Sequence, residues 1–317
     1  MNLFVIVLLF SVGLLLIVKG GDWFLDGAVW IAETSGIPHF IVGATVVSVA
    51  TTLPELTVSV TGVLRGEIDL AVGNAVGSVT ANLGLILGIS VLCIPSAVDR
   101  QFAPKAILML CGAALLTILC RNGSLTLLSA LLLFVIFALY LWSNLRDAGR
   151  GMAAERKSRA RRGGVSRRKM LSKLAMFFLG LAGIIGGSRL LIDYGSELAL
   201  RLGVPPGVIG VTLVAVGTSL PELVTALTAI AKKETAMSIG NIVGANVIDL
   251  TLVLPVCTAV SGGRLAIGSQ TTALDLPVCL GVCALAMLPP LAVGRFYRWQ
   301  GFLLLGMYAA YLAVLMA

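Results

Sequence analysis

Long apolar runs separated by short polar stretches recur along almost the whole chain. Most have about 20 residues, the length at which an α-helix crosses roughly 30 Å of membrane hydrocarbon. The ten runs of this kind are 2–19, 39–64, 69–95, 103–120, 124–144, 172–190, 206–231, 236–260, 272–290 and 298–316. Two further segments, 21–36 and 191–203, have the pattern of amphipathic extensions or short surface helices. The chain is therefore predicted to be an all-α membrane protein with ten transmembrane helices.

Composition and charge agree with this prediction. Hydrophobic residues make up 58% of the 317 and charged residues only 12%, too few to cover a soluble globule. The net charge of +8 does not indicate a nucleic-acid partner, because 11 of the 23 Lys and Arg residues lie between Arg146 and Lys173. Such a basic loop stays in the cytoplasm. We expect a multi-pass protein of the cell membrane (inner or plasma), with both termini outside and the lipid bilayer as its surroundings. No obligatory protein partner is implied.

The chain contains an internal repeat. Residues 43–82 align without a gap on residues 210–249, an offset of 167, with 15 identical positions. Duplication predicts a first five-helix repeat at 1–145, a flexible basic linker at 146–173 and a second repeat at 174–317. The repeat signatures cover 43–88 and 210–255. Because five crossings separate the copies, the two repeats should face opposite sides of the membrane, an inverted-topology architecture that many secondary transporters use.

Each signature places a glutamate beside a proline in an apolar run, at Glu55 and Glu222. A charged side chain at the centre of a membrane helix costs about 2.5–3.5 kcal/mol on insertion scales. The interpretation without a transport role is a glutamate neutralised by a proton or by a basic neighbour. The runs that carry the two signatures contain Lys or Arg only at their ends. A bound cation or a proton is therefore the expected partner.

Other oxygen donors lie at helical spacing from these glutamates. Thr51 and Glu55 share a helix face, and Pro54 lacks the amide hydrogen that would bond the carbonyl of Ala50. The second copy is expected to repeat this arrangement. Carboxylate, hydroxyl and carbonyl oxygens are the donors that Ca²⁺ takes. The predicted metal-binding residues are Glu55, Glu222, Thr51, Thr218, Thr52, Ser219, Ser78, Asn82 and Asp249.

At these positions the sequence resembles the cation/Ca²⁺ exchanger superfamily, in particular the sodium/calcium exchanger membrane domain and its compact prokaryotic members. The resemblance rests on segments 50–55 with 73–78 and 217–222 with 240–246. It implies ten helices in two inverted repeats. It also implies that Glu55 and Glu222 coordinate Ca²⁺ and that sodium occupies overlapping sites.

Three positions depart from the family pattern. Thr52 replaces the commoner serine but keeps its oxygen. Ala245 stands where the family usually has a serine, and Val79 stands where it usually has an asparagine. Asp249 matches an acidic position of the potassium-dependent branch, which potassium-independent microbial relatives also carry.

The predicted function is secondary active antiport of Ca²⁺ against Na⁺ by alternating access. Ca²⁺/H⁺ antiport and K⁺-dependent Na⁺/Ca²⁺ exchange are the alternatives, and a passive cation channel is a distant one. An enzyme is not expected, because the chain has one histidine and neither a Gly-x-Ser-x-Gly nor a His-Glu-x-x-His motif. The ions are cargo, and no cofactor is expected.

Overall fold

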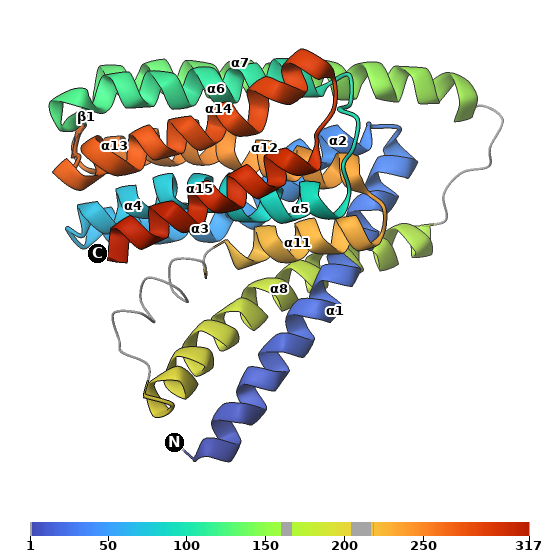
Figure 1. Cartoon of the computed structure of the whole chain (residues 1–317). Coiled ribbons are helices and arrows are strands. Elements are labelled where there is room, and N and C mark those ends of the chain that lie inside the picture. Colours follow the sequence, from blue (N-terminus) through green and yellow to red (C-terminus); the bar gives the residue numbers. More distant parts are fainter. Residues whose placement is uncertain (1, 160–166, 204–216, 218, 317) are drawn as a thin grey trace.

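The computed structural model describes residues 2–159, 167–203, 217 and 219–316. They form a nearly all-helical bundle, in which two long helices run diagonally away from the rest (Figure 1). Within these residues, nine helical segments are long and apolar enough to cross a membrane. The expected seventh span, 206–231, is represented by the shorter apolar helix α11 (Leu220–Ala231), and most of its first half lies outside the described residues.

The elements of the two halves follow one another in a similar order. The first half comprises α1 (Leu3–Ser35), α2 (His39–Val42), η1 (Gly43–Val47), α3 (Ser48–Leu64), α4 (Ile68–Ala81), η2 (Asn82–Leu87), α5 (Gly88–Cys93), α6 (Phe102–Leu119), η3 (Cys120–Asn122), β1 (Ser124–Thr126) and α7 (Leu127–Arg159). The second half comprises α8 (Arg167–Arg201), α11, α12 (Thr235–Ile248), η5 (Asp249–Val253), α13 (Leu254–Val260), β2 (Arg264–Ala266), η6 (Thr271–Asp275), α14 (Leu276–Val293) and α15 (Arg298–Met316). Helices α4 and α12 have the same bounds once the offset of 167 is applied.

The long helices α1 and α8 pack against each other through glycines. An added Cβ at Gly20 would lie 2.8 Å from the Gly180 carbonyl oxygen, and one at Gly187 would lie 2.7 Å from that of Gly13. Small residues at such a contact let two backbones approach closely. The segments 21–36 and 191–203 continue α1 and α8 as extensions of the same helices, so separate surface helices are not formed.

Helix α12 is the buried centre of the bundle, and every residue from Met237 to Ile248 is buried. It lies against the continuous segment α2–η1–α3 at two glycines. An added Cβ at Gly240 would meet the Phe40 carbonyl oxygen, and one at Gly244 would meet the hydroxyl of Ser48. The glycines of the second signature therefore allow close helix packing.

Short contacts join the helix ends. β1 pairs with β2 in an antiparallel two-stranded sheet, a small departure from the all-α prediction. At the other end of the bundle, His39 at the start of α2 contacts Glu234, the residue before α12. The distance between His39 Nδ1 and Glu234 Oε2 is 2.6 Å.

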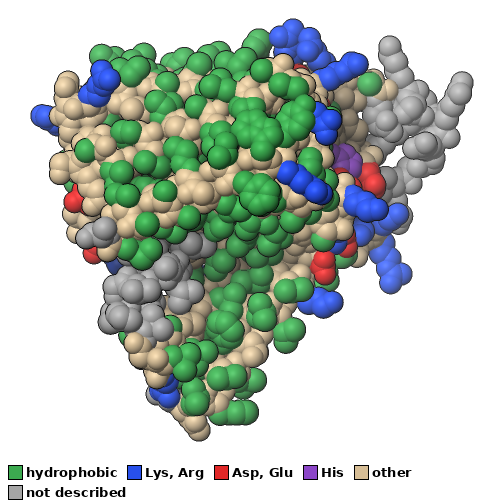
Figure 2. Space-filling model, viewed as in Figure 1, with side chains coloured by type: hydrophobic (Ala, Val, Ile, Leu, Met, Phe, Trp, Pro, Cys, Tyr) green, Lys and Arg blue, Asp and Glu red, His purple; other side chains and the backbone are tan. Residues whose placement is uncertain are grey.

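Figure 2 shows apolar side chains over the long sides of the molecule and Lys and Arg gathered near the end that carries the histidine. This distribution fits a protein whose sides face lipid.

Helices extend into the basic tract 146–173, which the sequence predicts to be a flexible linker. Helix α7 continues to Arg159 and α8 begins at Arg167, so both flanks of the basic tract are helical. Long helix-forming side chains such as Arg, Lys, Glu and Met fill these flanks and favour continued helix once the apolar run has ended. The central residues 160–166 lie outside the described part.

Candidate functional site

Three carboxylates are buried at the centre of the bundle. Glu55, Glu222 and Asp249 are each 1% exposed. Both carboxylate oxygens of Glu55 and of Asp249, and one of Glu222, have no hydrogen-bond partner. Among the described residues, no ion pair joins any of the three to a Lys or Arg. Buried charges without partners are strongly unfavourable, so these oxygens are poised for a positively charged ligand.

The two glutamates reach the site from helices that differ in shape. Pro54 and Glu55 lie inside α3, whereas Pro221 and Glu222 lie in the first turn of α11, which begins at Leu220. Proline is tolerated in a first turn because the amide hydrogen it lacks has no partner within the helix there. The carboxylate of Glu222 also gains from the positive end of the helix dipole. The predicted repetition of a mid-helix proline is therefore wrong for the second copy.

Hydroxyl groups connect the two halves at Glu222. Thr52 Oγ1 donates to Glu222 Oε1 at 3.4 Å, across 170 residues of sequence. Thr51 Oγ1 is 3.4 Å from Asn241 Oδ1, and the Asn241 amide donates to Thr225 Oγ1 at 3.0 Å. Threonines of α3, the glutamate of α11 and an asparagine of α12 therefore lie at one place.

Glu55 is held by the neighbouring helix α4. The side-chain amide of Asn74 donates to the main-chain carbonyl of Glu55 at 3.2 Å and to Ser59 Oγ at 3.0 Å. Ser59 Oγ in turn donates to the carbonyl oxygen of Ala71 at 3.2 Å. These bonds fix the backbone around Glu55 and leave its carboxylate free for another ligand.

Asn82 and Asp249 occupy equivalent places in the two halves. Each begins a π-helical turn, η2 or η5, which follows a regular helix of 14 residues. Such single π turns are frequent at functional sites because they redirect side chains and loosen the main-chain hydrogen bonds. The Asn82 amide donates to Asn246 Oδ1 at 3.2 Å, which leaves Asn82 Oδ1 without a partner.

The remaining predicted ligands differ in what the structure reveals of them. Ser78 and Ser219 are buried, and both hydroxyl oxygens lack a hydrogen-bond partner. Thr218 lies outside the described residues. Val79 and Ala245 are both fully buried, so the oxygens that the family pattern would supply there are replaced by apolar groups.

Within the described chain, no group of three His, Cys, Asp or Glu side chains comes close enough together to hold a metal ion. A cation bound here would thus need hydroxyl, amide and main-chain oxygens in addition to carboxylates. Ca²⁺ accepts such a mixed set of oxygens.

Sequence reasoning missed the supporting residues of the site. Asn241 and Thr225 link two helices, and Ser59 fixes Asn74. The identical Gly-Asn pairs at 73–74 and 240–241 were a usable signal, since a duplicated asparagine in an apolar run needs hydrogen-bond partners. The π turns had no comparable signal in the residue pattern.

Comparison with known proteins identifies the chain. The family model described as sodium/calcium exchanger protein matches residues 5–146 and 172–317. The chain belongs to this family. The family resemblance drawn from the two signatures is thereby confirmed, and this exchanger is a multi-pass membrane protein that carries ions.

Relatives match over nearly their whole length. An uncharacterized membrane protein of Methanocaldococcus jannaschii is 30% identical over 312 residues, 96% of each chain. The sodium/calcium exchanger MaX1 of Methanosarcina acetivorans is 28% identical, with 97% of each chain covered. A solved structure of the sodium-calcium exchanger NCX_Mj, soaked with Na⁺ and Sr²⁺, has a TM-score of 0.84 at 28% identity. That match covers 98% of this exchanger and 99% of the solved chain.

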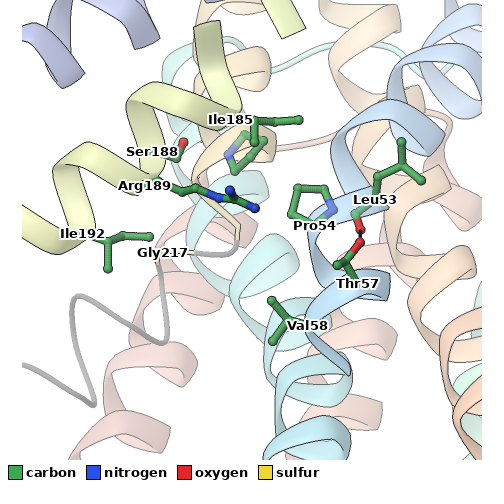
Figure 3. A pocket seen from close by; sticks show the side chains of 10 residues that line it. Leu53, Pro54, Thr57, Val58, Ile185, Ser188, Arg189, Ile192 and Gly217 are labelled. Carbon is green, nitrogen blue, oxygen red and sulfur yellow. Dashed lines mark hydrogen bonds between the residues drawn. The ribbon is translucent and has the colours of Figure 1, made fainter. Parts of the chain in front are cut away.

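A cavity of about 270 Å³ lies beside the site of this exchanger. Figure 3 shows Leu53, Pro54, Thr57 and Val58 of α3 on one side, and α8 on the other. From α8, Arg189 extends toward the gap between the helices (Figure 3). The cavity also reaches Gly217 and Pro221, next to Glu222. It therefore adjoins both Pro-Glu motifs.

Proposed function

We propose that this exchanger moves Ca²⁺ out of the cell against an inward flow of Na⁺, with Glu55 and Glu222 as the central ligands. The observation that carries the proposal is the set of buried carboxylate oxygens without partners at the meeting point of α3, α11 and α12. A divalent cation compensates two such carboxylates together. Sodium ions and protons are then competitors for the same oxygens.

The hydroxyl and amide groups around the glutamates would complete the ligand set. Ser78, Ser219 and the Oδ1 of Asn82 contribute oxygens that have no other partner in the described structure. Asp249 supplies two more. Thr51 and Thr52 already lie beside Asn241 and Glu222. By analogy with the first copy, Thr218 is assigned to the same set.

The two halves are proposed to be inverted repeats, and the contacts at the helix ends support this. The helical segment that contains α3 begins at His39, whereas Glu234, which contacts His39, follows the end of α11. Helices α3 and α11 are equivalent by the offset of 167, yet they run in opposite directions. Opposed repeats around a central site are the architecture with which many transporters expose one site alternately to each side.

The His39 end is proposed to face the cytoplasm. Gly151, in the part of the basic tract that forms the end of α7, lies so close to the turn before α2 that an added Cβ would be 2.7 Å from Pro38 Cδ. The tract and the His39 end therefore lie on the same side, and a basic tract of this density favours the inside. The N-terminus of α1 and the cavity at Pro54 are then nearer the outside.

Proton coupling is the main alternative. Val79 and Ala245 remove two oxygens that a sodium site could use, whereas the carboxylates remain. On the other hand, Asn246 contributes an amide at the position equivalent to Val79 and contacts Asn82. We favour sodium because hydroxyl and amide oxygens surround the glutamates, and a proton needs only the carboxylates.

Ion flux decides between these couplings. ⁴⁵Ca²⁺ uptake into proteoliposomes is measured while sodium, potassium and proton gradients are imposed independently. Uphill Ca²⁺ uptake driven by an outward sodium gradient is expected. If more than two sodium ions leave for each Ca²⁺ that enters, net positive charge moves outward, and an inside-negative potential should oppose uptake. Each charge moved is worth about 2.3 kcal/mol per 100 mV. Uptake that follows a pH gradient and ignores sodium would establish Ca²⁺/H⁺ antiport instead. If Ca²⁺ only moves down its own gradient and never uphill, the protein is a channel.

A further inference from the structure

The two long helices contact the bundle differently. An added Cβ at Gly21 of α1 would lie 2.9 Å from both Val224 Cγ1 and Thr228 Oγ1 of α11, so these helices touch. The equivalent region between α8 and α3 contains the cavity of about 270 Å³, which Thr57 and Ser188 help to line. One half of the molecule is thus closed where the other is open.

The internal repeat gives a residue-by-residue comparison of these two regions. Residues 13–38, most of which belong to α1, align on residues 180–205 with the same offset of 167, and eight of the 26 positions are identical. In this register Ser188 takes the place of Gly21, and Arg189 takes the place of Asp22. Both replacements lie at the helix face that the cavity separates from α3.

On the closed half, an ion-pair cluster joins α1 to the turn after α11. Lys232 Nζ lies 2.7 Å from Asp26 Oδ1 and 3.3 Å from Asp22 Oδ1, and it donates to the carbonyl oxygen of Asp22 at 3.0 Å. The lysine side chain is 28% exposed and each aspartate 43%. Two carboxylates around one ammonium group favour the closed position of α1.

On the open half, the counterparts cannot form the same cluster. The offset places Arg65 where Lys232 stands and Asp193 where Asp26 stands, but Arg189 replaces the second aspartate. Closure of α8 onto α3 would bring two arginines beside one carboxylate. In the described structure none of these three side chains has an ion-pair partner.

The neighbouring replacement opposes closure sterically. Gly21 has no side chain, and the contact with Val224 and Thr228 depends on that. Ser188 has a Cβ and a hydroxyl at the equivalent position, and its Oγ is buried without a hydrogen-bond partner. The charge of Arg189 and the side chain of Ser188 therefore both oppose closure of α8 onto α3.

We propose that Ser188 and Arg189 bias this exchanger toward the state in which the α3–α8 cavity is open, and that Lys232 latches the opposite end in that state. The proposal rests on the proposed alternating-access function, because it concerns the balance between the two states. It assigns the bias to differences between the halves, since two identical halves would give states of equal energy.

Thiol accessibility tests the bias. In a variant without the six native cysteines, a reporter cysteine replaces Val58, which lines the cavity. It is labelled in ion-free buffer with membrane-impermeant cationic and anionic thiosulfonates. The double variant Ser188→Gly with Arg189→Asp should slow labelling by both reagents about threefold to tenfold, the range expected for a partly exposed charge cluster. Arg189→Lys should label at the parent rate, and Arg189→Gln should lie between the two.

Opposite changes with the two reagents would mean that Arg189 affects only the local potential, and this overturns the proposal. Equal rates for Arg189→Lys and for the double variant Ser188→Gly with Arg189→Asp would also overturn it. Lys232→Gln tests the latch separately. It should slow labelling at the Val58→Cys reporter, and an unchanged rate contradicts the latch. ⁴⁵Ca²⁺ flux of the parent is measured on the same preparations. A parent without uphill uptake refutes the proposed function, whereas unchanged labelling in a transporting parent refutes the bias alone.

Discussion

Replacement of Glu55 by Gln tests the central role of the buried carboxylates. The glutamate is 1% exposed, neither carboxylate oxygen has a partner, and its main chain is held independently by Asn74. The amide has nearly the same shape and leaves that main-chain bond in place. The substitution therefore removes one negative charge from the site with little change in packing.

The expected loss of Ca²⁺ affinity follows from the burial of the Glu55 carboxylate. Removal of one partner from a buried charge pair costs about 3–5 kcal/mol. Since about 1.4 kcal/mol corresponds to a factor of ten, Ca²⁺ affinity should fall by about two to four orders of magnitude. The ion-free protein should respond in the opposite direction. Removal of one like charge beside Glu222 and Asp249, together with an amide that can donate to a neighbouring carboxylate, should stabilise it by about 1–3 kcal/mol.

Two measurements detect these opposite effects. ⁴⁵Ca²⁺ uptake in proteoliposomes should disappear, and thermal unfolding in detergent should show a higher midpoint without ions but no further rise with Ca²⁺. The parent should gain about 2.7 kcal/mol when Ca²⁺ is at 100 times its dissociation constant. Glu67→Gln is the matched control, because Glu67 is exposed in the α3–α4 turn. Uptake by Glu55→Gln above a tenth of the parent rate would refute the assignment.

Two further predictions concern the scaffold. Gly240→Ala should destabilise the protein by about 1–3 kcal/mol, because the added Cβ would overlap the Phe40 carbonyl oxygen, whereas the exposed Gly306→Ala should not. Thermal unfolding of both variants measures the difference, and equal midpoints would contradict the packing. Asp147→Asn should cost about 3–5 kcal/mol by the same assay, because Lys105 is fully buried against Asp147 and would lose its counter-charge. Lys105→Met should cost less, and the reverse order would contradict an ion-pair origin.

The apolar runs and the repeat were sufficient to predict most of the architecture. Hydrophobic length reports directly on membrane crossing, and helices α4 and α12 appear with identical relative bounds as the alignment requires. The continuous form of α1 and α8 was less clear, because their polar second halves resemble surface segments. Glycine contacts, which no single segment reveals, pack each of these second halves against the first half of the other helix, as at Gly27 with Phe177 and at Gly195 with Phe10.

The sequence by itself determined that Glu55 and Glu222 enter the membrane without basic partners, since burial of a charge is costly wherever the helices pack. Only the tertiary structure decided that Thr52 meets Glu222 and that Asn241 joins Thr51 to Thr225. It also decided that the α1 side is closed while the α8 side is open. Periodicity describes one helix face at a time. Contacts between distant segments depend on how the helices cross. Two related copies can therefore settle into different positions, and we assign that difference to a glycine and an aspartate of one copy that are a serine and an arginine in the other.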